Sequence, residues 1–233
     1  HVVCRRQRQM CIRDSSRVLI NGANGSGKEL AARCIHHQSD RRDSRFIVAN
    51  CARLGAERAD VELFGSDGVA TSRRIVGLFE QAHKGTLYFD EVCDLPLETQ
   101  GKIVRAVAEQ RFRRVGGNKE VSVDVRVISA SSRDLSAAIA EGRLREDLYY
   151  RLGVVPLSMP PLAERREDIP HLARHFVDLV ARRTGLGKVK LGDEVLSAMQ
   201  GYRWPGNVRQ MLNTIENMPV SYTHLRAHET DYY

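Results

Sequence analysis

The stretch Gly-Ala-Asn-Gly-Ser-Gly-Lys-Glu at residues 22–29 decides the fold. It follows a short apolar run, Arg17–Asn21, and precedes a segment, Glu29–His37, whose pattern predicts a helix. A strand, a glycine-rich loop and a helix in this order open a phosphate-binding β-α-β unit. Glycines let backbone N–H groups turn towards phosphate oxygens, and Lys28 would reach the β- and γ-phosphates. Glu29 stands where the strict pattern has Ser or Thr, and a glycine-rich surface turn is the alternative interpretation.

A second signal lies where the apolar run Thr86–Phe89 ends in Asp90 and Glu91. Ligands bind at the carboxyl ends of the strands in open α/β sheets. One carboxylate there can hold Mg²⁺ while its neighbour polarises an attacking water. An Asp-Glu pair is also common at the start of a helix, which is the alternative. The glycine loop and the acidic pair together, in this order, predict a protein that binds ATP and Mg²⁺.

The remaining apolar runs predict the architecture. After the first strand and helix, further strands are expected at Phe46–Ala49, Val121–Ser129 and Val154–Leu157, with helices at Glu57–Phe64, from Pro96 onward, and at Ala137–Glu141. This alternation implies a parallel sheet with right-handed crossovers. After Pro160-Pro161 only helical patterns follow, at Ile169–Arg182, Asp193–Gln200 and Asn207–Asn217. We therefore expect an α/β P-loop NTPase core over residues 15–160 and a C-terminal, all-helical lid over residues 161–219.

The two ends of the chain differ from the rest. Residues 1–14 and 220–233 share no periodicity with the segments between them and resemble translated adaptor read-through. We expect both tails to be non-native and the natural chain to be longer at both ends.

Composition narrows the class of protein. Of 233 residues, 42% are hydrophobic, which suffices for one α/β domain with a small second lobe. No window approaches the ~20 continuous apolar residues of a membrane span. The net charge is +7 but scattered, so we do not expect direct nucleic-acid binding by this segment. The five cysteines form no Cys-x-x-Cys pair, which is typical of reduced thiols in a cytoplasmic protein.

Further motifs over residues 15–219 match one known family. They include residues 50–52 (Asn-Cys-Ala), 62–65 (Glu-Leu-Phe-Gly), 114–117 (Arg-Val-Gly-Gly), 145–152 (Arg-Glu-Asp-Leu-Tyr-Tyr-Arg-Leu) and 204–209 (Trp-Pro-Gly-Asn-Val-Arg). The chain thus resembles the AAA+ sigma-54 interaction domain of bacterial enhancer-binding proteins, in which Glu follows the loop lysine. The resemblance implies an ATPase that assembles as a homo-oligomeric ring, usually a hexamer, and remodels the sigma-54 RNA polymerase holoenzyme. It also implies a flanking receiver or sensor domain and a C-terminal helix-turn-helix through which DNA would be bound, both absent from this sequence.

The resemblance assigns roles around the phosphate loop. It makes Lys28 the Walker A lysine, Asp90 the Walker B acid that holds the metal, and Glu91 the acid that activates water. Asn50 matches the residue that hydrogen-bonds the Walker B glutamate and switches it off. The residues implied to bind the nucleotide are Gly22, Ala23, Asn24, Gly25, Ser26, Gly27, Lys28, Glu29, Ser132 and Arg209.

Three arginines also receive roles from the resemblance. Arg145 and Arg151 match the arginines that act on the γ-phosphate of the neighbouring subunit, and Arg209 matches the sensor II arginine of the lid. A guanidinium at such a position stabilises charge on the transferring phosphoryl group. The alternative for the first two is a helix surface on which they pair with Glu146 or Asp147, and for Arg209 a lid-surface arginine.

Two departures from the family pattern bear on function. Residues 130–132 read Ala-Ser-Ser where the family has Ala-Thr-Asn, so Ser132 offers a shorter reach than an Asn amide. The interval Ser66–Leu78 lacks the Gly-Ala-Phe-Thr-Gly-Ala loop that contacts sigma-54, which resembles the NtrX branch of nitrogen-related response regulators. We therefore expect an ATP-binding and ATP-hydrolysing domain of a transcriptional response regulator that does not contact sigma-54. The alternatives are a nucleotide-binding oligomerisation module with little turnover and a conventional sigma-54-dependent activator.

Overall fold

The computed structural model describes residues 16–68, 74–185 and 189–218, and the chain divides into two compact units. The core unit comprises the chain up to Ala23 together with Gly27–Met159. The lid unit comprises Asn24–Ser26 together with the chain from Pro160 on. The tip of the glycine loop therefore groups with the helical unit, although both of its ends belong to the core unit.

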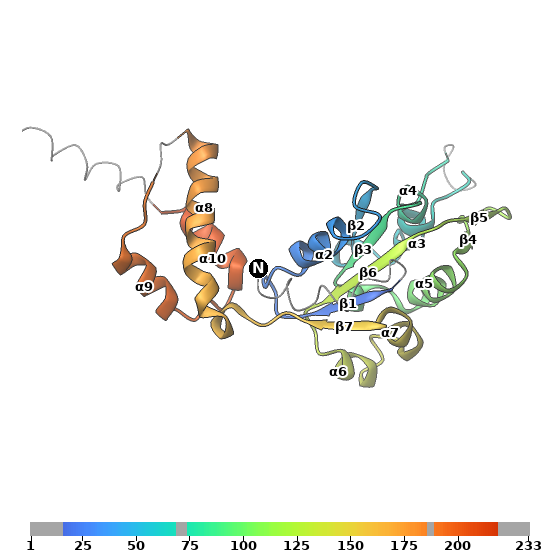
Figure 1. Ribbon diagram of the computed structural model, residues 1–233. Coiled ribbons are helices and arrows are strands. Elements are labelled where there is room, and N and C mark those ends of the chain that lie inside the picture. Colours follow the sequence, from blue (N-terminus) through green and yellow to red (C-terminus); the bar gives the residue numbers. More distant parts are fainter. Residues whose placement is uncertain (1–15, 69–73, 186–188, 219–233) are drawn as a thin grey trace, which may run out of the picture. The chain divides into compact units, whose positions relative to one another are not determined.

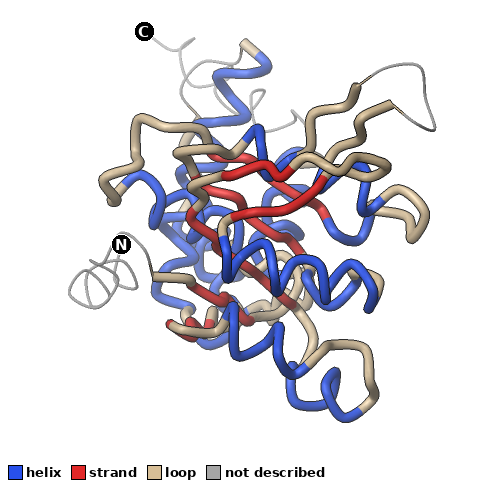
Figure 2. Tube along the Cα trace, turned by 90° about the vertical axis from the view of Figure 1, so that its right-hand side faces the viewer, coloured by secondary structure: helices blue, strands red, loops and turns tan. Residues whose placement is uncertain are grey.

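A five-stranded parallel sheet forms the centre of the core unit (Figures 1 and 2). Its order is β2-β3-β6-β1-β7, and each neighbouring pair runs parallel, as the alternating pattern predicts. The strands span Phe46–Asn50 (β2), Thr86–Asp90 (β3), Arg126–Ser131 (β6), Val18–Asn21 (β1) and Val155–Ser158 (β7). The carboxyl ends of β1, β3 and β6 therefore share one edge of the sheet, where the glycine loop and the acidic pair begin.

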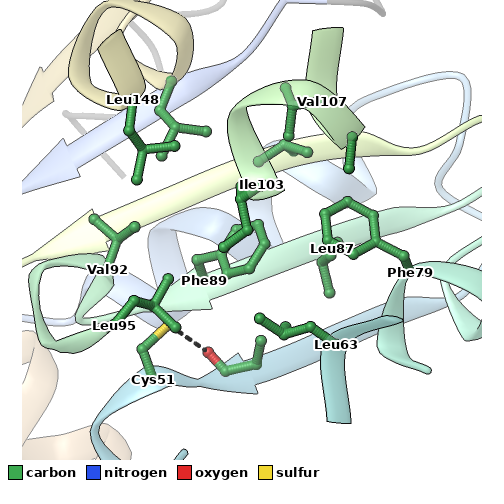
Figure 3. Close-up of a cluster of buried hydrophobic side chains, with 14 of the residues drawn as sticks. Cys51, Leu63, Phe79, Leu87, Phe89, Val92, Leu95, Ile103, Val107 and Leu148 are labelled. Atoms are coloured by element: carbon green, nitrogen blue, oxygen red, sulfur yellow. Dashed lines mark hydrogen bonds between the residues drawn. The ribbon is translucent and has the colours of Figure 1, made fainter. Parts of the chain in front are cut away.

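Side chains alternate between two hydrophobic clusters, one on each face of the sheet. Leu19 of β1 enters the larger cluster, together with Leu87 and Phe89 of β3, which Figure 3 shows. The residue between the latter two, Tyr88, enters the smaller one, in which Ala32 is buried. The helices of this unit span Lys28–His37 (α2), Ala59–Phe64 (α3), Leu78–Gln81 (α4), Leu97–Glu109 (α5), Leu135–Ala140 (α6) and Glu146–Leu152 (α7).

One expected strand proves to be two. The run 121–129 divides into β5 (Glu120–Ser122) and the sheet strand β6, with the exposed Asp124 between them. Strand β5 pairs antiparallel with β4 (Arg111–Arg113) in a separate hairpin. Phe112 of β4 anchors this hairpin, because its ring lies 5.5 Å from that of Phe64 and 5.7 Å from that of Phe79. The prediction of one continuous strand was wrong because a hairpin arm and a sheet strand carry the same apolar residues in direct succession.

The interval that departs from the family pattern is short and closed at its base. Ser66 and Ile75 exchange backbone hydrogen bonds of 3.0 and 2.9 Å, as in an antiparallel bridge. The buried Arg114 donates to both carboxylate oxygens of Glu80, at 2.8 and 2.7 Å, and to Asp67 at 3.1 Å. This network joins the end of β4 to α4 and to the base of the interval. Residues 69–73 of this interval lie outside the described residues.

Three helices make up most of the lid unit: α8 (Ile169–Thr184), α9 (Asp193–Gly201) and α10 (Asn207–Glu216). All three were predicted from the sequence pattern, within two residues at each end, and are confirmed. Their apolar faces bury Ile169, Met211 and Trp204, whose indole N–H donates to the Met199 carbonyl at 2.7 Å. Across the described ranges, no helix combines the length and the apolar character needed to cross a membrane.

Candidate functional site

Lys28 lies at the start of α2, directly after the glycine loop. Gly27 precedes it at φ +101°, a backbone conformation that favours glycine. The lysine is buried, with 6% of its surface exposed, and its Nζ donates to the Gly22 carbonyl at 2.9 Å. Nζ also forms an ion pair with Glu91 Oε1 at 3.1 Å. The structure thus brings the predicted loop lysine and the predicted water-activating acid into direct contact.

Both oxygens of Glu91 have partners. Oε1 faces Lys28, and Oε2 accepts two hydrogen bonds from Ser132, from the backbone N–H at 2.8 Å and from the hydroxyl at 2.9 Å. Glu91 itself adopts a left-handed conformation with φ +57°. Such a conformation is uncommon for a residue other than glycine and persists where its surroundings hold it. The two hydrogen bonds show that Ser132, despite its short side chain, reaches the acid that follows β3.

Asp90, the last residue of β3, is half-buried and is held by a neighbour on its own strand. The hydroxyl of Tyr88 donates to Asp90 Oδ1 at 3.0 Å. Burial raises the pKa of Asp90, the hydrogen bond from Tyr88 lowers it, and the nearby Glu91 raises it. A carboxylate in this setting is a good position for a divalent cation, which neutralises the charge. No group of three or more His, Cys, Asp or Glu side chains in the described residues could hold a metal alone. A bound Mg²⁺ would thus need phosphate and water ligands as well.

Asn50 ends β2 and lies in register with Asp90 on β3. The contact that the resemblance implies between Asn50 and Glu91 is not formed: within the described ranges no hydrogen bond joins the two side chains. The carboxylate of Glu91 is held instead by Lys28 and Ser132. In this conformation the position of the acid is set by those two residues.

The two arginines assigned to the subunit interface differ in their surroundings. Arg145 donates to both oxygens of Asp147, at 3.0 and 2.8 Å, as the simpler alternative for this pair expects. Arg151, in the last turn of α7, is exposed and has no hydrogen bond or ion pair in the part of the chain that the structure describes. Its charge contributes, after burial, to a lowered pKa of Arg17. Arg151 therefore carries an unneutralised charge at the surface.

The remaining predicted residues are divided between the two units. Glu29 is exposed and forms an ion pair with Arg33 on the surface of α2. In the lid unit, Arg209 is exposed and lines a hollow of about 650 Å³ together with Asn24 and Gly25. The Ser26 hydroxyl, also in the lid unit, is buried and has no hydrogen-bond partner among the described residues.

Sequence reasoning missed Tyr88 and two lid residues, Arg165 and Asn207, that contact the loop tip. Tyr88 had a weak signal, because a tyrosine two positions before a strand-end acid shares its face of the strand. Asn207 lies within the quoted motif 204–209, but nothing local predicts its contact or that of Arg165, since their partners lie more than a hundred residues away in the sequence.

These features define a class of protein. A glycine loop follows β1 of a parallel sheet, an acidic pair follows β3, and a helical lid follows the core, which together form the fold of a P-loop NTPase. The family model for the sigma-54 interaction domain matches residues 2–158, and the model for the AAA+ ATPase lid domain matches residues 163–229. The chain belongs to the family of AAA+ sigma-54 interaction domains.

Similar proteins include a nitrogen assimilation regulatory protein and a DNA-binding transcriptional regulator. The nitrogen assimilation regulatory protein NtrX of Azorhizobium caulinodans is 50% identical over 206 residues, covering 88% of this chain and 45% of the relative. The DNA-binding transcriptional regulator NtrC of Klebsiella pneumoniae is 46% identical over 211 residues, covering 89% and 45%. The chain thus spans less than half the length of these relatives.

Solved structures agree with this placement. The crystal structure of NtrX from Brucella abortus in complex with ATP superposes with a TM-score of 0.86 at 42% identity, covering 100% of this chain and 51% of that one. The complex of the same protein with ADP gives a TM-score of 0.87 at 42% identity, covering 99% and 50%. The resemblance inferred from the motifs is confirmed.

Proposed function

We propose that this chain binds ATP and Mg²⁺ and hydrolyses ATP at the interface between subunits of a homo-oligomeric ring. It would serve as the central ATPase domain of a bacterial transcriptional response regulator. The observation that carries this proposal is the 3.1 Å contact between Lys28 and Glu91 at the carboxyl edge of the sheet. The NtrX relative with bound ATP or ADP supports the choice of nucleotide.

The residues present fit a nucleotide. Gly25 and Gly27 adopt positive φ angles, and the buried Ser26 hydroxyl lacks a partner among the described residues, as expected of a loop that receives phosphate oxygens. Asp90 would hold the cation, which supplies charge stabilisation on the phosphoryl oxygens when bound. Lys28 would exchange Glu91 for the β- and γ-phosphates, which frees Glu91 to orient and deprotonate the attacking water. Arg151 of a neighbouring subunit would stabilise charge on the transferred group.

The test is the substitution Glu91→Gln. It should lower ATP turnover by about a hundredfold or more, because a group that accepts a proton is lost. ATP affinity should stay equal or rise, because Lys28 loses a competing carboxylate. Steady-state hydrolysis and nucleotide titration measure the two effects, with Glu98→Gln on the exposed surface of α5 as the matched control. Turnover of the Glu91→Gln chain equal to that of the parent would refute the assigned role.

A module with little turnover is a second candidate. It is favoured by the two hydrogen bonds of Ser132 and the ion pair of Lys28, which hold Glu91 away from a free, water-activating state. The two candidates differ in rate per subunit at saturating ATP. Hydrolysis that rises with protein concentration supports the ATPase, and binding without such turnover at any concentration supports the oligomerisation module.

We further propose that the chain does not contact sigma-54. The Ser66–Leu78 interval has no aromatic residue, so it lacks a large rigid side chain to anchor a small contact. Ser66 and Ile75 close the base of this interval by a backbone bridge. The whole regulator would instead contact DNA through a helix-turn-helix outside this chain and act on RNA polymerase holoenzyme carrying another sigma factor.

A native gel separates this proposal from a conventional activator. The chain is mixed with sigma-54 and an ATP transition-state analogue, beside a family member that carries Gly-Ala-Phe-Thr-Gly-Ala. We expect a shifted band for the control only. A shifted band of similar intensity for this chain would contradict the proposal, and grafting the missing loop between Gly65 and Phe79 should create the shift.

A further inference from the structure

The tip of the glycine loop is bonded through three consecutive carbonyl groups. The Asn24 carbonyl accepts from the side-chain amide of Asn207 at 2.9 Å. The Gly25 carbonyl accepts from the backbone N–H of Val208 at 3.0 Å, and the Ser26 carbonyl accepts from the guanidinium of Arg165 at 2.5 Å. Loop tip and donors all belong to the lid unit. The carbonyls of the loop tip are therefore fixed by protein donors alone.

Asn207 is the central residue of this arrangement. It is buried, with 2% of its surface exposed, and its backbone has φ +53°, a conformation that asparagine tolerates better than most residues. While its amide nitrogen donates to the Asn24 carbonyl, its amide oxygen accepts from the backbone N–H of Leu162 at 2.7 Å. Both ends of one side-chain amide are thus used, which leaves no other common side chain able to replace it fully.

Gly25 is required by the same arrangement. A Cβ atom at this position would lie 2.4 Å from the Gly206 carbonyl oxygen and 3.1 Å from Arg209 Cβ. The φ angle of Gly25, +73°, also favours glycine. The loop tip therefore approaches the start of α10 more closely than any residue with a side chain would allow.

The fixed carbonyls determine where the N–H groups point. In a planar trans peptide, the carbonyl of one residue and the N–H of the next point in opposite directions. Bonding the carbonyls of residues 24–26 thus turns the N–H groups of residues 25–27 to the other side of the loop. In the part of the chain that the structure describes, these three N–H groups donate no hydrogen bond. They are left free to receive an anion.

We propose that Asn207 and Arg165 are positioning residues that shape the phosphate loop before a nucleotide arrives. The inference rests on the proposed nucleotide binding and adds to it that the lid unit sets the geometry of the loop tip. A loop ordered in advance loses less conformational freedom on binding, so the affinity for the phosphates rises. The lid unit would then favour binding of the β-phosphate in both ATP and ADP, whether or not a γ-phosphate is present.

The first test is Asn207→Asp, which keeps the acceptor for Leu162 and replaces the donor to Asn24 by a carboxylate oxygen. Calorimetric titration of the 233-residue chain should show ADP binding about tenfold more weakly than to the parent. The affinity for AMP, which has no β-phosphate, should differ by no more than about twofold between the parent and the Asn207→Asp chain. Asn118→Asp, on the exposed turn between β4 and β5, is the matched control for the change of charge and should leave both affinities unchanged.

Substitutions at Arg165 give a second test that does not depend on the folding of the Asn207→Asp chain. Arg165→Gln should weaken ADP binding, and Arg165→Lys, which retains a cationic donor for the Ser26 carbonyl, should restore most of it. An ADP affinity within twofold of the parent for both Asn207→Asp and Arg165→Gln would overturn the inference. An equal loss of ADP and AMP binding would also overturn it, because a general disturbance of the site weakens both nucleotides, whether or not they carry a β-phosphate. Failure of the parent chain to bind ADP would instead refute the proposed function.

Discussion

Tyr88 joins the buried core to the candidate cation site through one side chain. Its ring is fully buried in the smaller hydrophobic cluster, 5.9 Å from the ring of Phe46, while its hydroxyl bonds Asp90. Burial, together with the charge of Asp90, raises the pKa of the Tyr88 hydroxyl, so it stays a proton donor over the whole physiological range. The tyrosine therefore favours the ionised form of an acid whose burial favours the neutral one.

Tyr88→Phe should move the pH dependence of cation binding. Burial already raises the pKa of Asp90, and loss of the hydrogen bond raises it further. Because the cation needs the ionised carboxylate, the acid limb of Mg-ATP affinity should shift to higher pH. In the Tyr88→Phe chain the folded state therefore keeps the proton of Asp90 to a higher pH than the unfolded state does. The free energy of unfolding should fall as the pH rises above the ordinary Asp pKa, over a wider range than in the parent. An acid limb that coincides with that of the exposed control Tyr150→Phe would contradict the assignment.

At the scale of elements, hydrogen bonds from Arg114 connect the β4–β5 hairpin to α4 and to the base of the Ser66–Leu78 interval. Its side chain is 8% exposed, and its guanidinium makes three charge-assisted hydrogen bonds to Glu80 and Asp67, which raise the pKa of Arg114. Removing one partner of a buried ion pair leaves the other charge without compensation. The hairpin should therefore depend on this residue more than on its exposed neighbours.

Arg114→Met should lower the free energy of unfolding by about 3 kcal/mol, because Glu80 and Asp67 would lose their hydrogen bonds to the guanidinium and Glu80 would keep only the longer, 3.8 Å ion pair with the exposed Arg74. Equilibrium urea denaturation measures the change, with the exposed Arg113→Met on the same hairpin as the matched control. The control should change stability by roughly 0.5 kcal/mol or less. Equal midpoints for the two variants would show that the network contributes nothing to the fold.

Local sequence predicts the helices and strands that carry a full pattern of apolar residues, and it misses those that depend on partners distant in the sequence. The five sheet strands and the three lid helices follow from apolar runs and helical spacing, and Lys28, Asp90 and Glu91 follow from motifs at strand ends. The hairpin arm Arg111–Arg113 has one apolar residue, Phe112, whose partners are known only once the chain has folded. The contacts of Asn207 with Asn24 and of Ser132 with Glu91 also join residues far apart in the sequence, so no short window contains both partners.

At the scale of the whole molecule, we expect Arg151 to act on a neighbouring subunit and Arg145 to have a local role. Arg151 is exposed and unpaired within the described ranges, whereas Arg145 is held by Asp147. We expect hydrolysis per subunit to rise with protein concentration. Arg151→Ala should lower turnover strongly and leave ATP affinity within about threefold, as expected of a group that acts on the transition state.

The contrast between the two arginines is the control. Arg145→Ala should lower turnover less than Arg151→Ala, because its guanidinium must first leave Asp147. A rate per subunit that does not depend on concentration, from a species that stays monomeric throughout, would exclude catalysis across an interface.

Nucleotide binding depends on Lys28, and titration with ATP measures this dependence. Lys28→Ala removes the buried cation that faces Glu91 and would face the β- and γ-phosphates. The Kd for ATP should rise at least tenfold, which corresponds to about 1.4 kcal/mol or more. Lys102→Ala, on the exposed surface of α5, should leave Kd unchanged. Superimposable titration curves for Lys28→Ala and the parent chain would contradict the account.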